Sequence, residues 1–315
     1  MSNTARNTDL GSWQTVTVSV ADMDAALALW RDQFGLTVVA TRDGPDTGLA
    51  TLWAIKPSDI RRQVLLATGD HRHGMLHLIE FAAPGEAVRE GAAVFDWVPK
   101  NLDIYVEDMP ARIAELLAAG YAFRADQFSE VTAPDGTRFR EIHMPAHDGL
   151  NIVLLELLDD SPPLTDRHYG AVGPLITIVP DANREKAFVA DVLEMDQLKD
   201  NKLDGPEIEA MIGLPSGAAL DVSIWGDKAQ SLGWLEIIEY QGTQGSDLYP
   251  RAKPPATGIL QLRYSVADLD AVTQNLKRKA VPFEALSALD LLDGSDDLVA
   301  LTTPAGLRLE IAEHR

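Results

Sequence analysis

A pattern of about twenty residues occurs four times along the chain, and this internal repeat restricts the fold more than any other feature. In each copy, apolar residues alternate as in a strand, an Asp follows, and the next residues have helical spacing. A carboxylate at this position accepts hydrogen bonds from the free N–H groups of a first helical turn. The four residues are Asp22, Asp108, Asp181 and Asp268. The sequence therefore predicts four strand-then-helix units.

The spacing of the copies groups them into two pairs. Asp22 and Asp108 are 86 residues apart, and Asp181 and Asp268 are 87 residues apart. Further strand-like segments follow each helix, separated by turn signals such as Pro-Asp-Gly at 134–136. Each unit is thus predicted to be a β-α-β-β-β module. The predicted fold class is α+β, with four modules arranged as two pairs.

The Pro- and Asp-rich segment 159–174 is the best boundary between the two halves of the chain. Two domains are therefore expected, each with two modules. The predicted bounds are 1–160 for the N-terminal domain, with modules at about 12–85 and 98–160, and 161–315 for the C-terminal domain, with modules at about 172–243 and 257–314.

Composition excludes several classes of function. The formal net charge of −21 repels phosphate backbones and anionic membranes, so neither nucleic acid nor a membrane is an expected partner. The chain has no cysteine, which excludes disulfides, thiolate nucleophiles and cysteine-bound metals. There is no apolar signal segment or membrane span, and a cytoplasmic location is expected. Motifs for nucleotide binding, serine hydrolases and HExxH metalloproteases are absent from the sequence.

The repeated strand, the Asp-started helix, the segment from Trp30 to Leu36 with Phe34-Gly35-Leu36 at its end, and the late strand LEIIE resemble the vicinal oxygen chelate superfamily. This superfamily includes glyoxalase I, methylmalonyl-CoA epimerase, extradiol dioxygenases and bleomycin-resistance proteins. The resemblance covers nearly the whole chain, and four modules in one polypeptide look most like extradiol dioxygenases. It implies that each pair of modules forms a U-shaped sheet, or cup, around one pocket, with modules one and two in the first cup and modules three and four in the second.

Strand alternation predicts which side chains point into the cups. In the first strands of modules one, two and four, one apolar face is expected under the helices: Val16/Val18/Val20, Leu102/Ile104/Val106 and Leu262/Tyr264/Val266. The opposite, inward face carries Thr15/Thr17/Ser19, Asn101/Asp103/Tyr105 and Gln261/Arg263/Ser265. Module three has Pro174, Ile176 and Ile178 at these places and is the most apolar inside.

In metal-using members of the superfamily, the first inward position is usually His or Gln. This register places Thr15, Asn101, Pro174 and Gln261 there, so the usual His ligands are missing and the iron site of extradiol dioxygenases is not expected. The resemblance to glyoxalase-type sites instead suggests Glu236, Gln261 and Glu310 in the second cup as ligands for one divalent ion. The alternative has no cofactor. In that case Glu310 is the base and Arg263 supplies positive charge, and Glu236 beside Glu310 would raise one carboxyl pKa so that the pair acts as a general acid and base.

The same alternation gives a set of expected pocket residues, which are His77, Asn101, Asp103, Tyr105, His143 and Tyr240. For His77 and His143 a second interpretation stays open, in which local hydrogen bonds satisfy a histidine in the core or at its rim.

Two functions from different classes are compatible with these residues. The first is a catabolic enzyme that acts through an enolate, as an isomerase, epimerase or lyase. Its substrate is a small, oxygenated, largely apolar molecule, and aromatic compounds are among the candidates. The second is a protein of the bleomycin-resistance type that binds such a molecule without changing it. The expected partner is a small molecule in both cases, and a homodimer is left open.

Overall fold

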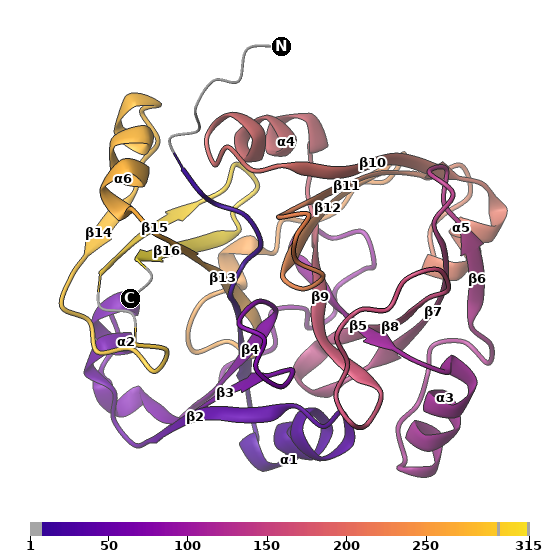
Figure 1. The fold of residues 1–315 in the computed structure, drawn as a ribbon, viewed down its shortest axis with the longest axis horizontal. Coiled ribbons are helices and arrows are strands. Elements are labelled where there is room, and N and C mark those ends of the chain that lie inside the picture. The colour runs from indigo at the N-terminus through magenta and orange to yellow at the C-terminus, as the bar shows by residue number, and fades with distance from the viewer. Residues whose placement is uncertain (1–7, 295–296, 314–315) are drawn as a thin grey trace.

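The computed structural model describes residues 8–294 and 297–313, which form two eight-stranded sheets with helices packed against them (Figure 1). The first sheet has the order β14 (Glu284–Leu286), β15 (Leu298–Thr302), β16 (Arg308–Glu313), β13 (Gly258–Val266), β1 (Thr15–Val20), β4 (Met75–Phe81), β3 (Ile60–Ala67) and β2 (Thr37–Asp43). The second has the order β10 (Gln197–Asp204), β11 (Ala219–Trp225), β12 (Trp234–Gln241), β9 (Tyr169–Ile178), β5 (Pro99–Val106), β8 (Asn151–Leu157), β7 (Arg138–Pro145) and β6 (Ser129–Thr132). The predicted α+β fold of paired modules is confirmed.

One α-helix follows the first strand of each module, as the repeat predicts, and two further α-helices follow second strands. The α-helices are α1 (Met23–Leu27), α2 (Thr47–Trp53), α3 (Met109–Ala118), α4 (Ala182–Asp191), α5 (Pro206–Ile212) and α6 (Leu269–Arg278). A π-helical turn continues α1 over Ala28–Gln33, and short 3₁₀ turns occupy Pro57–Asp59, His147–Gly149 and Tyr249–Arg251. In the described chain, no helix is long and apolar enough to cross a membrane.

All four repeated Asp residues cap a helix, which confirms the prediction made from the repeat. The side chain of each one accepts a hydrogen bond from the backbone N–H three residues later. The donors are Ala25 at 3.0 Å, Ala111 at 3.3 Å, Arg184 at 3.0 Å and Ala271 at 2.8 Å. Each cap satisfies one of the N–H groups that a helix leaves free at its start and typically contributes about 1 kcal/mol.

The predicted pairing of modules within each half is wrong. β1 of module one runs antiparallel to β13 of module four, with Thr15 opposite Arg263. β5 of module two runs antiparallel to β9 of module three, with Leu102 opposite Leu175. Because the first strands of the four modules are so similar, their spacing could not tell which two would meet edge to edge. Each sheet contains strands from both halves, so the predicted boundary at residue 160 does not separate the sheets.

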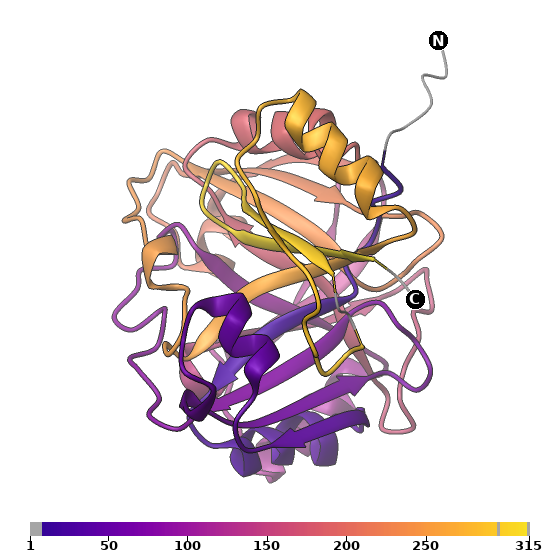
Figure 2. The ribbon, with the colours of Figure 1, turned by 90° about the vertical axis from the view of Figure 1, so that its left-hand side faces the viewer.

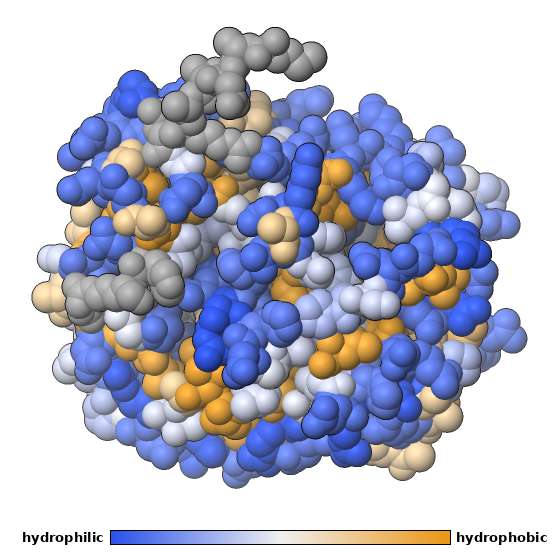
Figure 3. All heavy atoms as spheres, in the orientation of Figure 1, coloured by the Kyte–Doolittle hydropathy of each residue, from blue (hydrophilic) through white to orange (hydrophobic). Residues whose placement is uncertain are grey.

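One continuous core joins the two sheets to their helices. The apolar faces predicted for β1, β5 and β13 belong to it, and their members from Val16 to Val266 are at most 4% exposed. Phe34, which follows α1, stacks on Tyr169 of β9 with ring centroids 4.6 Å apart. In α6, Asn275 donates to the carbonyl of Val192 after α4 at 2.7 Å. The helices therefore hold modules of one sheet against modules of the other. Hydrophilic side chains cover most of the face in Figure 3.

Candidate active site

The cup of the second sheet encloses a cavity of about 650 Å³. Its floor comes from β5, β8, β9 and β12, and its sides from β7, β10, β11 and α5. Apolar side chains such as Val153, Leu155, Ile176, Val222 and Ile238 form much of the wall. A small group of polar side chains also lines it, namely Lys100, Asn101, Asp103, Tyr105, Glu141, His143, Glu236 and Tyr240. An apolar cavity with a few convergent polar groups is the usual form of a small-molecule site.

Three of the carboxyl groups that line this cavity lie on strands of the sheet. Asp103 lies on β5, Glu236 on β12 and Glu141 on β7. Asp103 is 8% exposed, and its Oδ1 atom has no hydrogen-bond partner among the described residues. Burial raises the pKa of Asp103 well above its ordinary value, and the negative charges of Glu236 and Glu141 raise it further. Burial, with the charge of Glu141, also raises the pKa of Glu236 to about 7. Glu236 therefore titrates near neutral pH, and the charged form of Asp103 is disfavoured in the same cavity.

Lys100 is the buried cation of the cavity and is 5% exposed. The register between β5 and β9 shifts between Pro99 and Asn101, as at a β-bulge. At this irregularity Lys100 lines the cavity together with Asn101, although simple alternation would put it on the face of Leu102. The Nζ atom of Lys100 donates to the Tyr240 hydroxyl at 2.8 Å. Burial lowers the pKa of Lys100 to about 7, and nearby Arg89 and Arg124 lower it too.

A hydrogen-bonded chain fixes the amides and the histidine at one side of the cavity. Asn151 Nδ2 donates to Asn101 Oδ1 at 2.9 Å and lies 3.0 Å from His143 Nδ1. Arg124 Nε donates to Asn151 Oδ1 at 2.7 Å. The Nε2 atom of His143 is 3.6 Å from Glu141 Oε1, which is an electrostatic contact rather than a hydrogen bond. This chain orients His143 and Asn101 in the wall.

The cup of the first sheet is filled by the protein itself. Helix α2 and the segment 289–293 lie in front of its strands in Figure 2. Leu49, Leu52, Leu289 and Leu291 pack there in one apolar cluster with Ile79 and Phe81 of β4. The two inserted segments touch so closely that a Cβ atom at Gly48 would lie 2.5 Å from the carbonyl oxygen of Asp290. These two segments, α2 and residues 289–293, occupy the space that a ligand takes in an open cup and are called the plug below.

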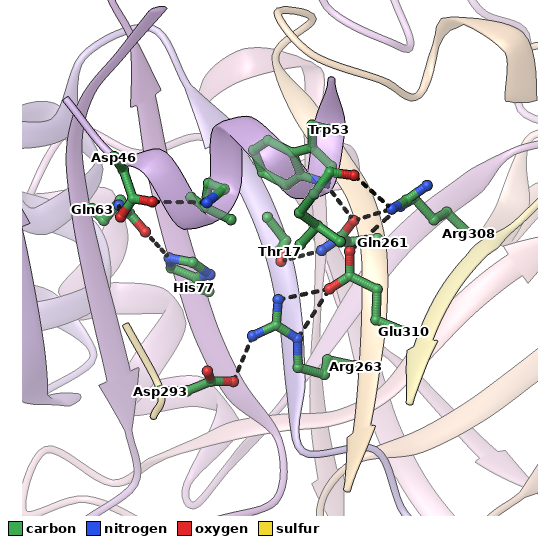
Figure 4. A network of polar contacts seen from close by, with 12 residues as sticks. Thr17, Asp46, Trp53, Gln63, His77, Gln261, Arg263, Asp293, Arg308 and Glu310 are labelled. Atoms are coloured by element: carbon green, nitrogen blue, oxygen red, sulfur yellow. Dashed lines mark hydrogen bonds and ion pairs between the residues drawn. The ribbon is translucent and has the colours of Figure 1, made fainter. Parts of the chain in front are cut away.

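A buried network of polar side chains lies beneath this plug (Figure 4). Arg263 donates to Glu310 Oε2 from Nε at 3.0 Å and from Nη2 at 2.6 Å, and its Nη1 donates to Asp293 at 2.6 Å. Glu310 is 0% exposed. The Gln261 Oε1 atom accepts from Trp53 Nε1 of α2 at 3.0 Å and from Arg308 Nε at 3.1 Å. The network thus ties the plug to β13 and β16.

His77 belongs to the same filled cup. Its Nε2 atom is 3.1 Å from Gln63 Oε1, and Gln63 Nε2 donates to Asp46 Oδ2 at 2.7 Å. Asp46 also caps α2 by accepting from the N–H of Leu49 at 2.7 Å. Burial, and secondly the positive charge of Arg263, lower the pKa of His77 to about 4. This neutral imidazole is a buried, hydrogen-bonded histidine and does not line the cavity.

Known structures share this arrangement along nearly the whole chain. Glyoxalase I from Zea mays has a TM-score of 0.63 at 14% identity, over 96% of this chain and 92% of that one. A mutant of the same enzyme has a TM-score of 0.65 at 13% identity, over 96% and 92%. A Bacillus subtilis protein proposed to be a dioxygenase has 0.62 at 10%, over 97% and 86%. The chain has the vicinal oxygen chelate fold. No family model and no curated protein matches the sequence.

Within this fold the predicted site residues fall into two separate places. Those in the wall of the cavity are Asn101, Asp103, Tyr105, His143, Glu236 and Tyr240, and their contact with a substrate stays a prediction. Those in the filled cup are His77, Gln261, Arg263 and Glu310. The proposed metal set of Glu236, Gln261 and Glu310 is not assembled, because Glu236 is in the second sheet and the other two are in the first. Among the described residues, no three His, Asp or Glu side chains are grouped so that they could hold a metal ion.

The polar residues Glu141 and Lys100 were not assigned to the cavity from the sequence, although the sequence contains an indication for each. Glu141 stands two residues before His143, so strand alternation puts both on the same face. Lys100 lies two residues before Leu102, on a face that is otherwise apolar in this strand. A charge on such a face, next to a proline that cannot donate to the ladder, indicates a bulge or a functional group.

The two carboxylates predicted as a metal pair should have opposite effects on stability. Replacing Glu310 by Gln takes one of two carboxylates from buried Arg263, so the free energy of unfolding should fall by on the order of 3 kcal/mol. Replacing Glu236 by Gln removes a carboxylate whose raised pKa shows that its charge is disfavoured in the fold, so stability at pH 8 should stay equal or rise. Urea denaturation of both variants measures this. A Glu236 variant that loses as much stability as the Glu310 variant would contradict the assignment.

His77 should make the protein sensitive to acid. Its folded pKa of about 4 lies below the ordinary value of 6.5, so below pH 6.5 only the unfolded chain takes up the proton. Its contribution to the free energy of unfolding should therefore be lost as the pH falls from 6.5 to 4 and be constant above 6.5, by about 3 kcal/mol at most. Denaturation of wild type and His77→Gln at several pH values isolates the contribution of His77 to the free energy of unfolding. Parallel curves for the two proteins would rule it out.

Proposed function

We propose that the chain is an enzyme that moves a proton at a carbon atom next to a carbonyl group of a small, largely apolar molecule. The observation that carries the proposal is the carboxyl pair Asp103 and Glu236 in the wall of the cavity, with the pKa of Glu236 at about 7. A base whose pKa lies near the working pH takes up and returns a proton most effectively. The fold shared with glyoxalase I supports an enzyme by analogy.

The residues of the cavity divide the reaction between them. Glu236 in its carboxylate form accepts the proton from carbon, and burial and the neighbouring carboxylates favour the protonated form of Asp103 in the same cavity. The carbonyl oxygen then becomes an enolate. Tyr105 and Tyr240 line the same cavity, and burial raises the pKa of both above the ordinary range. Both phenols therefore stay protonated at neutral pH and donate hydrogen bonds to a developing negative oxygen.

The fate of the enolate decides the reaction class. Return of the proton from Glu236 to the same carbon on the other face gives an epimerase, and return to a different carbon gives an isomerase. Expulsion of a group from the neighbouring carbon gives a lyase. The proposal assigns no step to a metal ion, since the residues of the cavity do not provide a ligand set for one among the described residues.

Removal of the base should abolish proton transfer. Glu236→Gln keeps the shape of the side chain and should slow exchange by at least ~100-fold. The measurement is deuterium uptake from D₂O, followed by mass spectrometry, at the carbon next to the carbonyl in a panel of apolar ketones and aldehydes. The matched control is Glu284→Gln, which removes an exposed carboxylate from β14 of the first sheet and should leave exchange unchanged. Full exchange in the Glu236 variant would remove this residue from the mechanism.

The same assay should depend on pH in one direction. Glu236 must be ionised to accept a proton, so the rate should rise as pH increases through about 7. Its raised pKa means that at pH 5 the group is almost wholly protonated and the rate is low. A rate that is constant from pH 5 to 8 in wild type would contradict a role for Glu236 as base.

The aliphatic wall of the cavity favours a second candidate function, which is binding of an apolar molecule without reaction. A ligand that binds only the folded state raises the melting temperature in a concentration-dependent way. A panel compound that raises the melting temperature but exchanges no deuterium at any pH would support this second function over the first.

A further inference from the structure

The amino group of Lys100 stands apart from the other buried cations because it has no carboxylate partner. Among residues 8–294 and 297–313, no Asp or Glu oxygen lies within ion-pair distance of its Nζ atom, which contacts the Tyr240 hydroxyl instead. Arg263 is also buried but lies between two carboxylates. Lys186 likewise pairs with Asp200 and Asp221. A buried ammonium without a partner is costly, and the neutral amine is the form that such a site favours.

The charges around Lys100 act in opposite directions on its amino group. Arg89 precedes β5 and Arg124 follows α3, and both oppose a positive charge on Nζ. Glu141 of β7, Asp103 of β5 and Glu236 of β12 favour that charge when ionised, but burial disfavours the ionised forms of Asp103 and Glu236 themselves. Burial outweighs them, and the pKa of Lys100 falls to about 7, whereas the ion pairs of Lys186 raise the pKa of that lysine.

We propose that Lys100 is a covalent catalyst that forms an imine with the carbonyl group of the substrate. The supporting geometry is a lysine amine in the wall of a cavity of about 650 Å³, free of ion pairs and on the same wall as the carboxyl pair that moves protons. A lysine that is desolvated, or that lies beside another cation, is the kind that attacks carbonyl carbon. The inference rests on the proposed function, because it names how the same site activates its substrate.

The step balances without any oxidant or further reactant. The lone pair of the Lys100 amine forms a bond to the carbonyl carbon, and the carbonyl π electrons move to oxygen, which takes up the proton lost by nitrogen. Protonated Glu236 then gives a proton to the hydroxyl, which leaves as water, and a C=N⁺ bond forms. The Glu236 carboxylate next takes the proton from the neighbouring carbon and the electrons move into the iminium, giving an enamine. Protonated Glu236 then returns a proton to the carbon chain, which restores the iminium. Water adds to the iminium carbon with loss of a proton to the Glu236 carboxylate, and the reversed first steps release the product and the free amine.

This chemistry restricts the substrate class. The carbonyl must be an aldehyde or an unhindered ketone, because esters, amides and carboxylates do not form imines under these conditions. The neighbouring carbon must carry a hydrogen. The rest of the molecule must fit an aliphatic wall that includes Val153, Leu155 and Ile176. An apolar or aryl-substituted ketone or aldehyde meets these conditions.

Reductive trapping tests the proposal on the wild-type protein, so that no variant has to fold. The protein is incubated with benzaldehyde and sodium cyanoborohydride at pH 6 to 9, and adducts are located by peptide mapping, which separates lysines from the chain's α-amino group. We expect Lys100 to be labelled on the order of 100-fold faster than exposed Lys56 at pH 7, since an ordinary lysine is almost wholly protonated there. Its rate should have its midpoint near pH 7.

The matched control is Lys277→Arg, which removes an exposed lysine of α6 outside the cavity and should leave the labelling of Lys100 unchanged. Labelling spread evenly over the lysines, or no Lys100 adduct at pH 8 while surface lysines react, would overturn the proposal. Reductive trapping measures only the reactivity of the lysine amine and not the proton transfer by Glu236. If Glu236→Gln loses deuterium exchange but no Lys100 adduct forms, the imine is contradicted and the proposed function stands. If a Lys100 adduct forms but exchange does not depend on Glu236, the proposed function is contradicted and the nucleophilic lysine stands.

Discussion

The pairing of first strands across the two halves of the chain is the constraint on which the rest of the structure depends. Backbone hydrogen bonds between β1 and β13, and between β5 and β9, decide which inner faces lie in the same cup. Asp103 and Glu236 share a cavity because β9 lies between their strands. The same pairing puts Trp53 of module one within hydrogen-bond distance of Gln261 of module four, since these two modules share the other sheet. Had modules one and two paired, neither set of contacts would exist.

The two cups show how one module pattern leads to opposite results. In the first cup, an inserted helix and a leucine-rich segment supply apolar contacts, and every charge of the Arg263 network has a partner of opposite sign. A buried charge of this kind is tolerated because its partners replace the water that it loses. In the second cup no such segment fills the space, and the walls include carboxyl groups and an amine that lack ion pairs among the described residues. The first arrangement serves stability, and the second provides reactive groups.

Sequence reasoning succeeded wherever the information was local. The role of Asp22 and its three counterparts as helix caps follows from the first turn alone, and the burial of Val16, Val18 and Val20 follows from a period of two. The partner of each sheet edge is non-local, because four similar strands offer several pairings that local pattern does not distinguish. The metal set containing Glu310 failed for that reason. Lys100 was missed for a different reason. The register of β5 shifts between Pro99 and Asn101, so Lys100 lines the cavity although strict alternation puts it on the apolar face.

The electrostatics of the second cup argue that its polar groups are kept for chemistry. Raised pKa values of Asp103 and Glu236 and the lowered pKa of Lys100 mean that each group is less stable in its usual charged form when folded than when unfolded. Apolar side chains of similar size would remove that cost in a wall already rich in Leu, Ile and Val. Buried groups that oppose folding without pairing to each other are the pattern found where a protein moves protons or attacks a carbonyl group. In the filled cup, by contrast, the buried charges of the same chain are paired, as expected where side chains serve stability alone.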